Sequence, residues 1–557
     1  MNRTNKGMVL LAALLLAVLI GYPVFIIIIR SFTLDGALSL ENYKEAFFDS
    51  SNYKALMHSL IVSASSTVLA TIIGCGAAYF TVRTDMAFKK LVHSLFLFNF
   101  FIPPFIMAMA WRQILGPVGT VNKLYQALTG STDTIINIYG QGGIILVFTL
   151  SSSAMVYMVM RSNFEKIQSS LEEAAVITGA SPFHIFTDIV MPVLKPSIFS
   201  AMILVFVANM SNYGVPSVLG FHVSYYTLTT RIRQVLEDFS MANNMEVAAS
   251  LSTVLVIITV LTLTAKDRML KGKEFTLITG KSEKAAPNEL GRWRIPMGIV
   301  WSLYGMAISF CPILSILATS LTKAYGLPFS IENFSLKNYA TVLNMPLFQR
   351  AMQNSLFLAF TAAFISVAIG FLVAYLCVMA RSKASGILEF VISMPAAIPG
   401  TVMAIAIILA WLRPIPVLGF SIYNTIWIIL IAYVANYTTQ AFRTISGSMY
   451  QINRSLEEAA VISGAELPKI MTSIVIPLIK ESIGTSWFLI FIPCLRELTL
   501  SIFLWSSGNE TLATAIFTLQ DAGNYTASCA LSILIIAMIA AVNIFVGKVF
   551  HIKGTVG

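Results

Sequence analysis

The sequence predicts an all-α integral membrane protein with about twelve transmembrane helices. Its 557 residues are 57% hydrophobic and only 11% charged, whereas a soluble domain carries about 25% charged residues. The apolar residues form continuous runs of the roughly 20 residues that a helix needs to cross a bilayer. This composition excludes a soluble protein. The net charge of +10 is better explained by membrane topology than by nucleic acid, which we do not expect as a partner.

The order of the apolar runs sets the expected topology. The first run follows a short basic tail, and it is longer than the apolar part of a signal peptide. No small-residue cleavage site follows it, so we interpret it as a retained first span. The twelve expected spans are 8–29, 56–82, 92–115, 143–160, 197–221, 247–265, 296–320, 354–380, 388–412, 424–442, 483–505 and 528–549.

The placement of lysine and arginine predicts that both termini are cytoplasmic. With the N-terminus inside, the cytoplasmic segments hold 24 basic residues and the outside segments hold 10. Basic residues concentrate on the cytoplasmic side of membrane proteins. The five cysteines form no CxxC pair, so we expect neither a disulfide framework nor a zinc site.

The two halves of the chain repeat each other. Gly74 matches Gly370 at an offset of 296, and the segment 172–195 aligns with 457–480 at an offset of 285. Each repeat holds six spans, an even number, so both copies keep the same orientation and the repeat is parallel rather than inverted.

The repeat divides the chain into three expected parts. The first six-span repeat covers 1–265, and the second covers 296–557. Between them, 266–295 is a hydrophilic segment with eight basic residues. We interpret this segment as a solvated cytoplasmic linker.

One motif occurs in both repeats, on loops that the charge distribution places in the cytoplasm. It reads Glu-Ala-Ala, three residues, Gly, nine residues, then Ile-x-x-Pro. This pattern resembles the EAA loop of the membrane subunits of bacterial ATP-binding-cassette (ABC) importers. Its residues are Glu173, Ala174, Ala175, Gly179, Ile189 and Pro192 in the first copy, and Glu458, Ala459, Ala460, Gly464, Ile474 and Pro477 in the second.

The residue types explain how such a loop binds a partner. Glu and Ala favour a helix start, the glycine breaks the helix with a positive φ, and a second short helix runs to the proline. A helix–turn–helix knob of this kind fits a groove in a cytoplasmic protein. The resemblance implies that this protein is an ATPase, present in two copies. The alternative is a helix pair that only stiffens the loop.

The resemblance also implies the fold, the location and the partners. It implies a type I ABC importer-like permease fold and a location in the bacterial inner membrane, in contact with lipid. It also implies an extracytoplasmic binding protein that delivers a small solute. The sequence Gly280-Lys281-Ser282 is not a phosphate-binding loop, because Phe275 stands where that motif requires glycine. We therefore expect no ATPase site, no cofactor and no metal site in this chain, with ATP and Mg bound by the partner ATPase.

The fused arrangement of two permease repeats resembles the ferric-iron permeases, whose relatives also serve thiamine and aminoalkylphosphonates. The resemblance includes 212–220, 496–499 and 511–514. It implies ferric iron as cargo, with thiamine, an aminoalkylphosphonate or another small solute as alternatives. An iron path is expected to present several hard oxygen ligands, whereas only Glu497 is plainly an intramembrane carboxylate, and this scarcity counts against iron without excluding it. A secondary transporter driven by an ion gradient is a further alternative, which the repeated EAA loop disfavours.

Polar residues inside the predicted spans indicate where the cargo passes, because a charged residue at the centre of a span costs about 2.5–3.5 kcal/mol. Arg496 and Glu497 lie near the middle of the eleventh predicted span. We expect a translocation path lined by Asn212, Tyr213, Arg496, Glu497 and Thr499. The alternative is that the two charged residues form structural ion pairs with other helices.

Prolines interrupt the third predicted span of each half, at Pro103-Pro104 and at Pro395 and Pro399. Broken helices often line substrate routes in transporters, because their freed backbone groups need a cavity or a partner. Simple helix kinks are the alternative.

Overall fold

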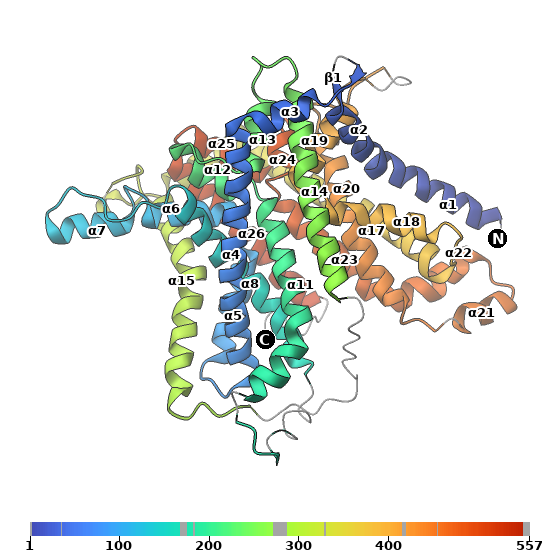
Figure 1. The fold of residues 1–557 in the computed structure, drawn as a ribbon, viewed down its shortest axis with the longest axis horizontal. Helices are drawn as coiled ribbons and strands as arrows, with labels where there is room; N and C mark the ends of the chain where they lie inside the picture. Colours follow the sequence, from blue (N-terminus) through green and yellow to red (C-terminus); the bar gives the residue numbers. More distant parts are fainter. Residues whose placement is uncertain are drawn as a thin grey trace. The chain divides into compact units, whose positions relative to one another are not determined.

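The computed structural model describes residues 3–34, 36–167, 175, 177–181, 184–270, 287–327, 330–414, 419–453 and 455–549. In these ranges the regular structure is helical (Figure 1), apart from two isolated β-bridges and one hairpin of β1 (Thr33–Leu34) and β2 (Ala37–Leu38), in which Thr33 pairs with Leu38. The segment Gly280-Lys281-Ser282 and the predicted coupling residues Glu173 and Ala174 lie outside the described residues.

The described helices confirm the predicted fold class. Nine of them are long and apolar enough to cross a membrane, and the number rises to eleven when each of two bent helix pairs is counted as one span. A further helix of 24 residues, α20 (Ile426–Met449), is too polar to meet the same criterion. The nine are Lys6–Ser31, Ser50–Arg83, Gln141–Glu165, Ile185–Met210, Asn244–Ala265, Gly291–Ser320, Pro346–Met379, Leu467–Leu495 and Tyr525–Ile544.

Eight helices of the first half have a counterpart in the second half, which extends the sequence repeat to the structure. Up to the third span their first residues differ by 296, and from the fourth span they differ by 285 or slightly less. The corresponding pairs are α3 (Glu41–Phe48) with α16 (Lys337–Asn344), α4 (Ser50–Arg83) with α17 (Pro346–Ala374), α5 (Lys89–Phe101) with α18 (Ser385–Ser393), α6 (Pro104–Leu115) with α19 (Gly400–Trp411), α8 (Gln141–Glu165) with α20, α11 (Met191–Met210) with α23 (Ile476–Leu495), α13 (Leu228–Leu236) with α25 (Leu512–Asp521), and α14 (Asn244–Leu270) with α26 (Tyr525–Val549).

The change of offset locates an insertion in the first half. Between α6 and α8 the chain has residues 116–140, whereas between α19 and α20 it has only 412–425. The fall from 296 to 285 corresponds to eleven extra residues in the first half. This longer connection contains the helix α7 (Thr120–Thr129), and the described part of the second connection holds no such helix.

Contacts between residues divide the chain into two compact units, which exchange the first span of each repeat. One unit contains 1–49, 232–256 and 339–557, and the other contains 50–231 and 257–338. In the first unit, α1 (Arg3–Leu16) packs on α18, and α2 (Tyr22–Ser31) packs on α19. In the second unit, α15 (Arg294–Ser320) packs on α5 and α6. The predicted domain limits, which follow the sequence repeat, stay a prediction.

Hydrogen bonds to backbone carbonyls hold the exchanged span α15 in place. Asn99 Nδ2 donates to the Ile308 carbonyl at 2.6 Å, and Ser309 Oγ donates to the Leu95 carbonyl at 2.6 Å. Both bonds are buried and join residues more than 200 positions apart. Inside a membrane such bonds are an important source of helix association, because lipid is as apolar as the side chains themselves.

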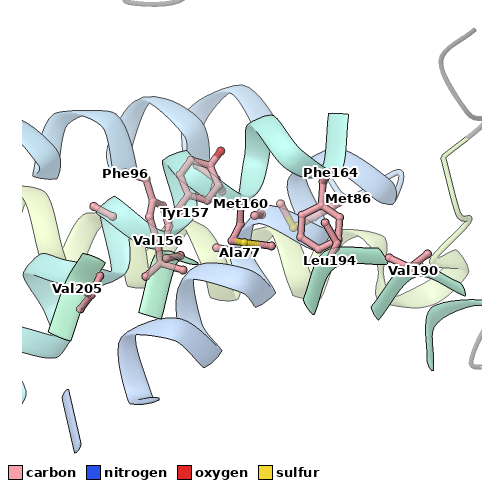
Figure 2. Close-up of a cluster of buried hydrophobic side chains, with 14 of the residues drawn as sticks. Ala77, Met86, Phe96, Val156, Tyr157, Met160, Phe164, Val190, Leu194 and Val205 are labelled. Atoms are coloured by element: carbon pink, nitrogen blue, oxygen red, sulfur yellow. The ribbon is translucent and has the colours of Figure 1, made fainter. Parts of the chain in front are cut away.

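The core of the second unit lies where α4, α8 and α11 meet. Figure 2 shows Ala77, Val156, Tyr157, Met160 and Leu194 gathered there, all buried. Small residues on α4 allow the close approach of α8. A Cβ added at Gly74 would lie 2.6 Å from Val156 Cβ, a distance that the packed helices do not permit.

The third span of each half is broken at the predicted prolines, and the fifth span differs from the continuous helix that was predicted. In the first half, the third span bends by 106° between Lys89–Phe100 and Pro104–Thr129. In the second half, it bends by 114° between Ser385–Ala397 and Gly400–Trp411. These bends support the broken-helix interpretation, because a proline cannot donate the hydrogen bond that continues a helix. The fifth spans were predicted at 197–221 and 483–505. Their helices instead end at Met210 and Leu495, and the chain resumes in α12 (Gly214–Gly220) and α24 (Ser501–Leu504).

Candidate coupling loops and helix breaks

The second EAA loop has the predicted helix, glycine and turn. Helix α21 (Ser455–Ile462) contains Glu458, Ala459 and Ala460. Gly464 follows with φ +79°, which a residue with a Cβ adopts only with strain. The Ala465 amide then donates to the Ala460 carbonyl at 2.9 Å, which closes the turn after the helix.

The described part of the first EAA loop repeats this geometry. Gly179 has φ +83°, and the Ala180 amide donates to the Ala175 carbonyl at 3.0 Å. Each of these positions is 285 residues before its counterpart in the second loop. Two loops in different units therefore share one turn, as the repeated motif predicted.

The segment after each turn differs from the short separate helix that was predicted. A π-helical turn covers Ile185–Val190 in the first half and Met471–Val475 in the second, and each continues directly into α11 or α23. Pro192 and Pro477 stand at the second residue of those helices and lack the N–H that would bond four residues back. The helix therefore widens instead of ending, and each loop is joined to its span by a continuous helix.

Apolar side chains are exposed at equivalent places on both loops. Ile177 and Ile462 are each 86% exposed, and Val461 is also exposed. Beside the second loop lies an open groove of about 570 Å³, whose lining includes Gly464, Glu466 and Lys469. An exposed apolar residue on a polar loop, next to a groove, is typical of a protein–protein contact.

The predicted path residues of the second half lie at a helix break instead of inside a continuous span. Arg496 is the residue that ends α23, and Glu497 and Thr499 lie between α23 and α24. The prediction of a charged pair in mid-helix is therefore wrong in its local structure. Pro493 lies three residues before Arg496 within the last turn of α23, where its missing N–H weakens the helix.

The carboxylate of Glu497 holds this break in shape. The Leu500 amide donates to Glu497 Oε1 at 3.0 Å, and the Tyr437 hydroxyl donates to Oε2 at 2.8 Å. A second tyrosine of α20, Tyr433, shares a hydrogen bond with Ser501 at 2.7 Å. Both carboxylate oxygens thus accept hydrogen bonds. Without them, the Leu500 amide and the Tyr437 hydroxyl would be donors without an acceptor away from water.

The break beside Glu497 meets the break of the third span in the same unit. A Cβ added at Gly400 would lie 3.5 Å from Thr499 Cγ2 and 3.9 Å from Leu500 Cγ. Gly400 is the first residue of α19, directly after the bend at Pro399. The structure therefore brings together two interruptions that the sequence placed about 100 residues apart, and it adds Tyr437, which sequence reasoning missed. The two tyrosines four residues apart within a predicted span were the available signal.

The predicted path residues of the first half lie in the other unit, at the equivalent break. Asn212 Oδ1 accepts a hydrogen bond from the Val215 amide at 3.0 Å, and Thr229 Oγ1 donates to the Asn212 carbonyl at 3.0 Å. Tyr213 is completely buried. Asn212 thus accepts a backbone amide of the first turn of α12, much as Glu497 accepts the amide of the residue just before α24.

A third repeated feature fixes the helix that follows each break. Ser59 Oγ accepts from the Leu228 amide at 2.7 Å, and Ser355 Oγ accepts from the Leu512 amide at 2.8 Å. Each acceptor lies in the second span of its half, and each donor begins α13 or α25. The repeat is therefore preserved down to single hydrogen bonds.

An ion pair ties the same region of the second half together. Arg350 Nη2 lies 3.3 Å from Glu510 Oε1, and the Gly508 amide donates to the same oxygen at 3.1 Å. Burial by itself raises the pKa of the Glu510 carboxyl, but the hydrogen bonds from Arg350 and from the backbone outweigh it and hold the pKa below its ordinary value.

Comparison with known protein families agrees with this architecture. Residues 70–268 and 366–550 each match the family described as the inner membrane component of binding-protein-dependent transport systems. Together the two matches cover more than half of the chain. The chain belongs to this family, and it is a multi-pass membrane permease with two family domains in one polypeptide.

Three relatives show how the chain compares with individual members. It is 24% identical to the ferric transport system permease protein FbpB of Actinobacillus pleuropneumoniae over 97% of this chain and 77% of that protein. It is 22% identical to the Fe(3+)-transport system permease protein FbpB 2 of Haemophilus influenzae over 97% of this chain and 98% of that protein. The putrescine transport system permease protein PotI of Escherichia coli is 26% identical, and the match covers 46% of this chain and 91% of PotI.

Proposed function

We propose that this chain is the permease subunit of an ATP-driven importer of ferric iron, which an extracytoplasmic binding protein delivers. The family match supports the dependence on a binding protein. Two relatives that align with 97% of this chain are named as ferric transport permeases, which supports iron as the cargo. Thiamine or an aminoalkylphosphonate is the alternative cargo.

The energy for transport comes from a separate ATPase, one copy bound at each EAA loop. The observation that carries this proposal is the repeated turn, with φ +83° and +79° at Gly179 and Gly464 and an equally exposed isoleucine on each loop. Two copies of one subunit require two similar binding surfaces. Because the loops are continuous with α11 and α23, a movement of the bound ATPase is transmitted directly to the helices that end at the breaks.

This arrangement assigns the chemistry and the topology. ATP and Mg bind to the ATPase, and this chain provides the docking surface and the path. The EAA loops and both termini lie in the cytoplasm, as the distribution of lysine and arginine predicts. Asn212, Tyr213, Arg496, Glu497 and Thr499 contribute to the path, with Tyr437 and Gly400 beside the last three.

Docking is tested by charging the exposed isoleucine of one loop. In Ile462→Asp, an apolar contact worth about 1.5–3 kcal/mol is lost, and co-purification of the ATPase with the chain should fall about tenfold or more. Gln451→Asp adds the same charge at an exposed position just before α21, and it should retain the ATPase. If both variants retain the ATPase equally, the loop is not the docking surface.

The cargo is tested in cells with and without this chain. Uptake of radiolabelled ferric iron should depend on the chain, on ATP, and on an intact Ile462. If iron uptake is unchanged in the deletion strain, the iron assignment is wrong, and labelled thiamine and an aminoalkylphosphonate are measured in the same cells. If uptake persists without ATP but stops when the ion gradient collapses, the ABC mechanism itself is wrong.

A further inference from the structure

The insertion in the first half forms a two-sided helix. In α7, the apolar residues Val121, Leu124, Tyr125 and Leu128 recur at the spacing of one helix face. Leu124 is 60% exposed and Leu128 is 77% exposed. This apolar face is therefore open along most of its length within the described residues.

The opposite face of α7 is held by hydrogen bonds to its own unit. Asn122 is buried, its Nδ2 donates to the Gly116 and Ile136 carbonyls at 2.7 Å each, and its Oδ1 accepts from the Ile135 amide at 2.9 Å. Lys123 Nζ donates to the Gly326 carbonyl at 2.8 Å. These bonds fix the rotation of the helix and so determine which face is left open.

The direction of α7 places it across the spans. The segment Pro104–Thr129, which ends with α7, is bent by 106° from Lys89–Phe100, and α5 packs along the spanning helix α15. Figure 1 shows α7 projecting sideways from the column that contains α5 and α15. A helix nearly perpendicular to a span runs parallel to the membrane plane.

The level of α7 is set by its contact with the chain just after α15. Gly326, which accepts the Lys123 bond, follows the end of α15 at Ser320. The start of α15 lies beside the end of α4, because the Ala87 amide donates to the Arg294 carbonyl at 3.1 Å. The chain crosses the membrane twice between the end of α4 and the first EAA loop, so these two segments lie on the same side of the membrane. The helix α7 is therefore at the opposite membrane surface.

We propose that α7 is an interfacial helix, with its apolar face in the lipid boundary of the leaflet opposite the EAA loops. A helix with one apolar face, lying in the membrane plane at the level where a span ends, matches the geometry of monotopic membrane helices. The spanning helix α15, beyond whose end α7 lies, also exposes apolar side chains, at Leu303 and Leu314. Tyr125 is an aromatic residue of the kind enriched at this level.

The face of α7 can be read out in the whole chain reconstituted in phosphatidylcholine vesicles. An environment-sensitive fluorescent amino acid is encoded in place of Leu128 or, as the control, Thr134, which is exposed on the loop after α7. Lipids that carry a nitroxide near the headgroup should quench position 128 about twofold more than position 134. Nitroxide deep in the acyl chain should quench position 128 less than the shallow nitroxide does.

Three results would overturn the proposal. Equal quenching of the two positions would place Leu128 in water, and stronger quenching by the deep nitroxide would place α7 inside the bilayer. Shielding of position 128 that appears only when periplasmic extract is added would assign the face to a protein partner instead of lipid.

Hydrogen exchange provides a second measurement on variants that keep the fold of the spans. A free helix of ten residues is marginal in water, so contact with lipid should slow the exchange of the α7 amides. Leu128→Asp should accelerate that exchange, whereas Ala127→Asp, on the flank of the same helix, should leave it near the wild-type rate. Equal rates in the two variants would contradict a lipid contact at Leu128.

Discussion

Glu497 carries the sharpest prediction about the path, because two substitutions separate its charge from its hydrogen bonds. Glu497→Ala removes the acceptor of the Leu500 amide and of the Tyr437 hydroxyl. A buried donor left unsatisfied costs about 1–3 kcal/mol. The two losses together should therefore destabilise the protein by roughly 2–6 kcal/mol.

Glu497→Gln keeps both contacts and removes only the charge. The amide oxygen of glutamine accepts from Leu500, and the Tyr437 hydroxyl accepts from the amide nitrogen. The remaining cost is the difference between charge-assisted and neutral hydrogen bonds, about 1–2 kcal/mol. If the carboxylate contacts a cationic cargo, transport should fall strongly in this variant although the protein folds.

The assay measures both properties for each variant, folding on the purified protein and uptake in cells. The amount of monodisperse protein and the thermal midpoint in lipid nanodiscs report folding, and iron uptake is normalised to folded protein. Tyr437→Phe is the matched control, since it deletes one hydrogen bond and keeps the charge. Wild-type uptake per folded molecule in Glu497→Gln would refute the role in the path, and equal midpoints for the Ala and Gln variants would refute the hydrogen-bond reasoning.

Three further predictions concern the packing and the loops. Gly370→Ala should lower the thermal midpoint, because its methyl would lie 2.7 Å from the nearest atom of α20 and overpacking costs about 1–3 kcal/mol. A Cβ added at Gly447 would have no atom within 4 Å, so Gly447→Ala should raise the midpoint slightly. Equal midpoint shifts in the two glycine variants would contradict the close packing at Gly370. Glu510 has a lowered pKa, so its stabilising effect is present above the unfolded pKa and is lost as the pH falls through the folded pKa. The difference in thermal midpoint between wild type and Arg350→Gln should therefore shrink on acidification. A difference that stays constant with pH would show that it does not arise from the ion pair of Arg350 with Glu510. Ser355→Ala should speed hydrogen exchange of the amide that begins α25, and unchanged protection would show that this bond does not fix the helix.

The sequence alone determined the class of protein and the repeat, and it predicted the turn in each EAA loop. These properties depend on composition and on local patterns, because apolar run length decides whether a segment spans a membrane. A glycine after Glu-Ala-Ala also sets the turn within a few residues, which is why the positive φ of Gly179 and of Gly464 could be predicted. The correspondence of the two halves could be found from identical residues at the offsets of 296 and 285.

The tertiary structure decided how distant segments combine. The exchange of first spans rests on contacts such as Asn99 with Ile308, and no local pattern specifies which helix a long apolar run packs against. The meeting of Gly400 with Thr499 turns two separate irregularities into one site that includes Tyr437. The open face of α7 follows from its sequence, but its position at the end of α15 follows from a hydrogen bond across about 200 residues. Local periodicity sets which face of a helix is apolar, and only packing with remote segments sets what that face meets.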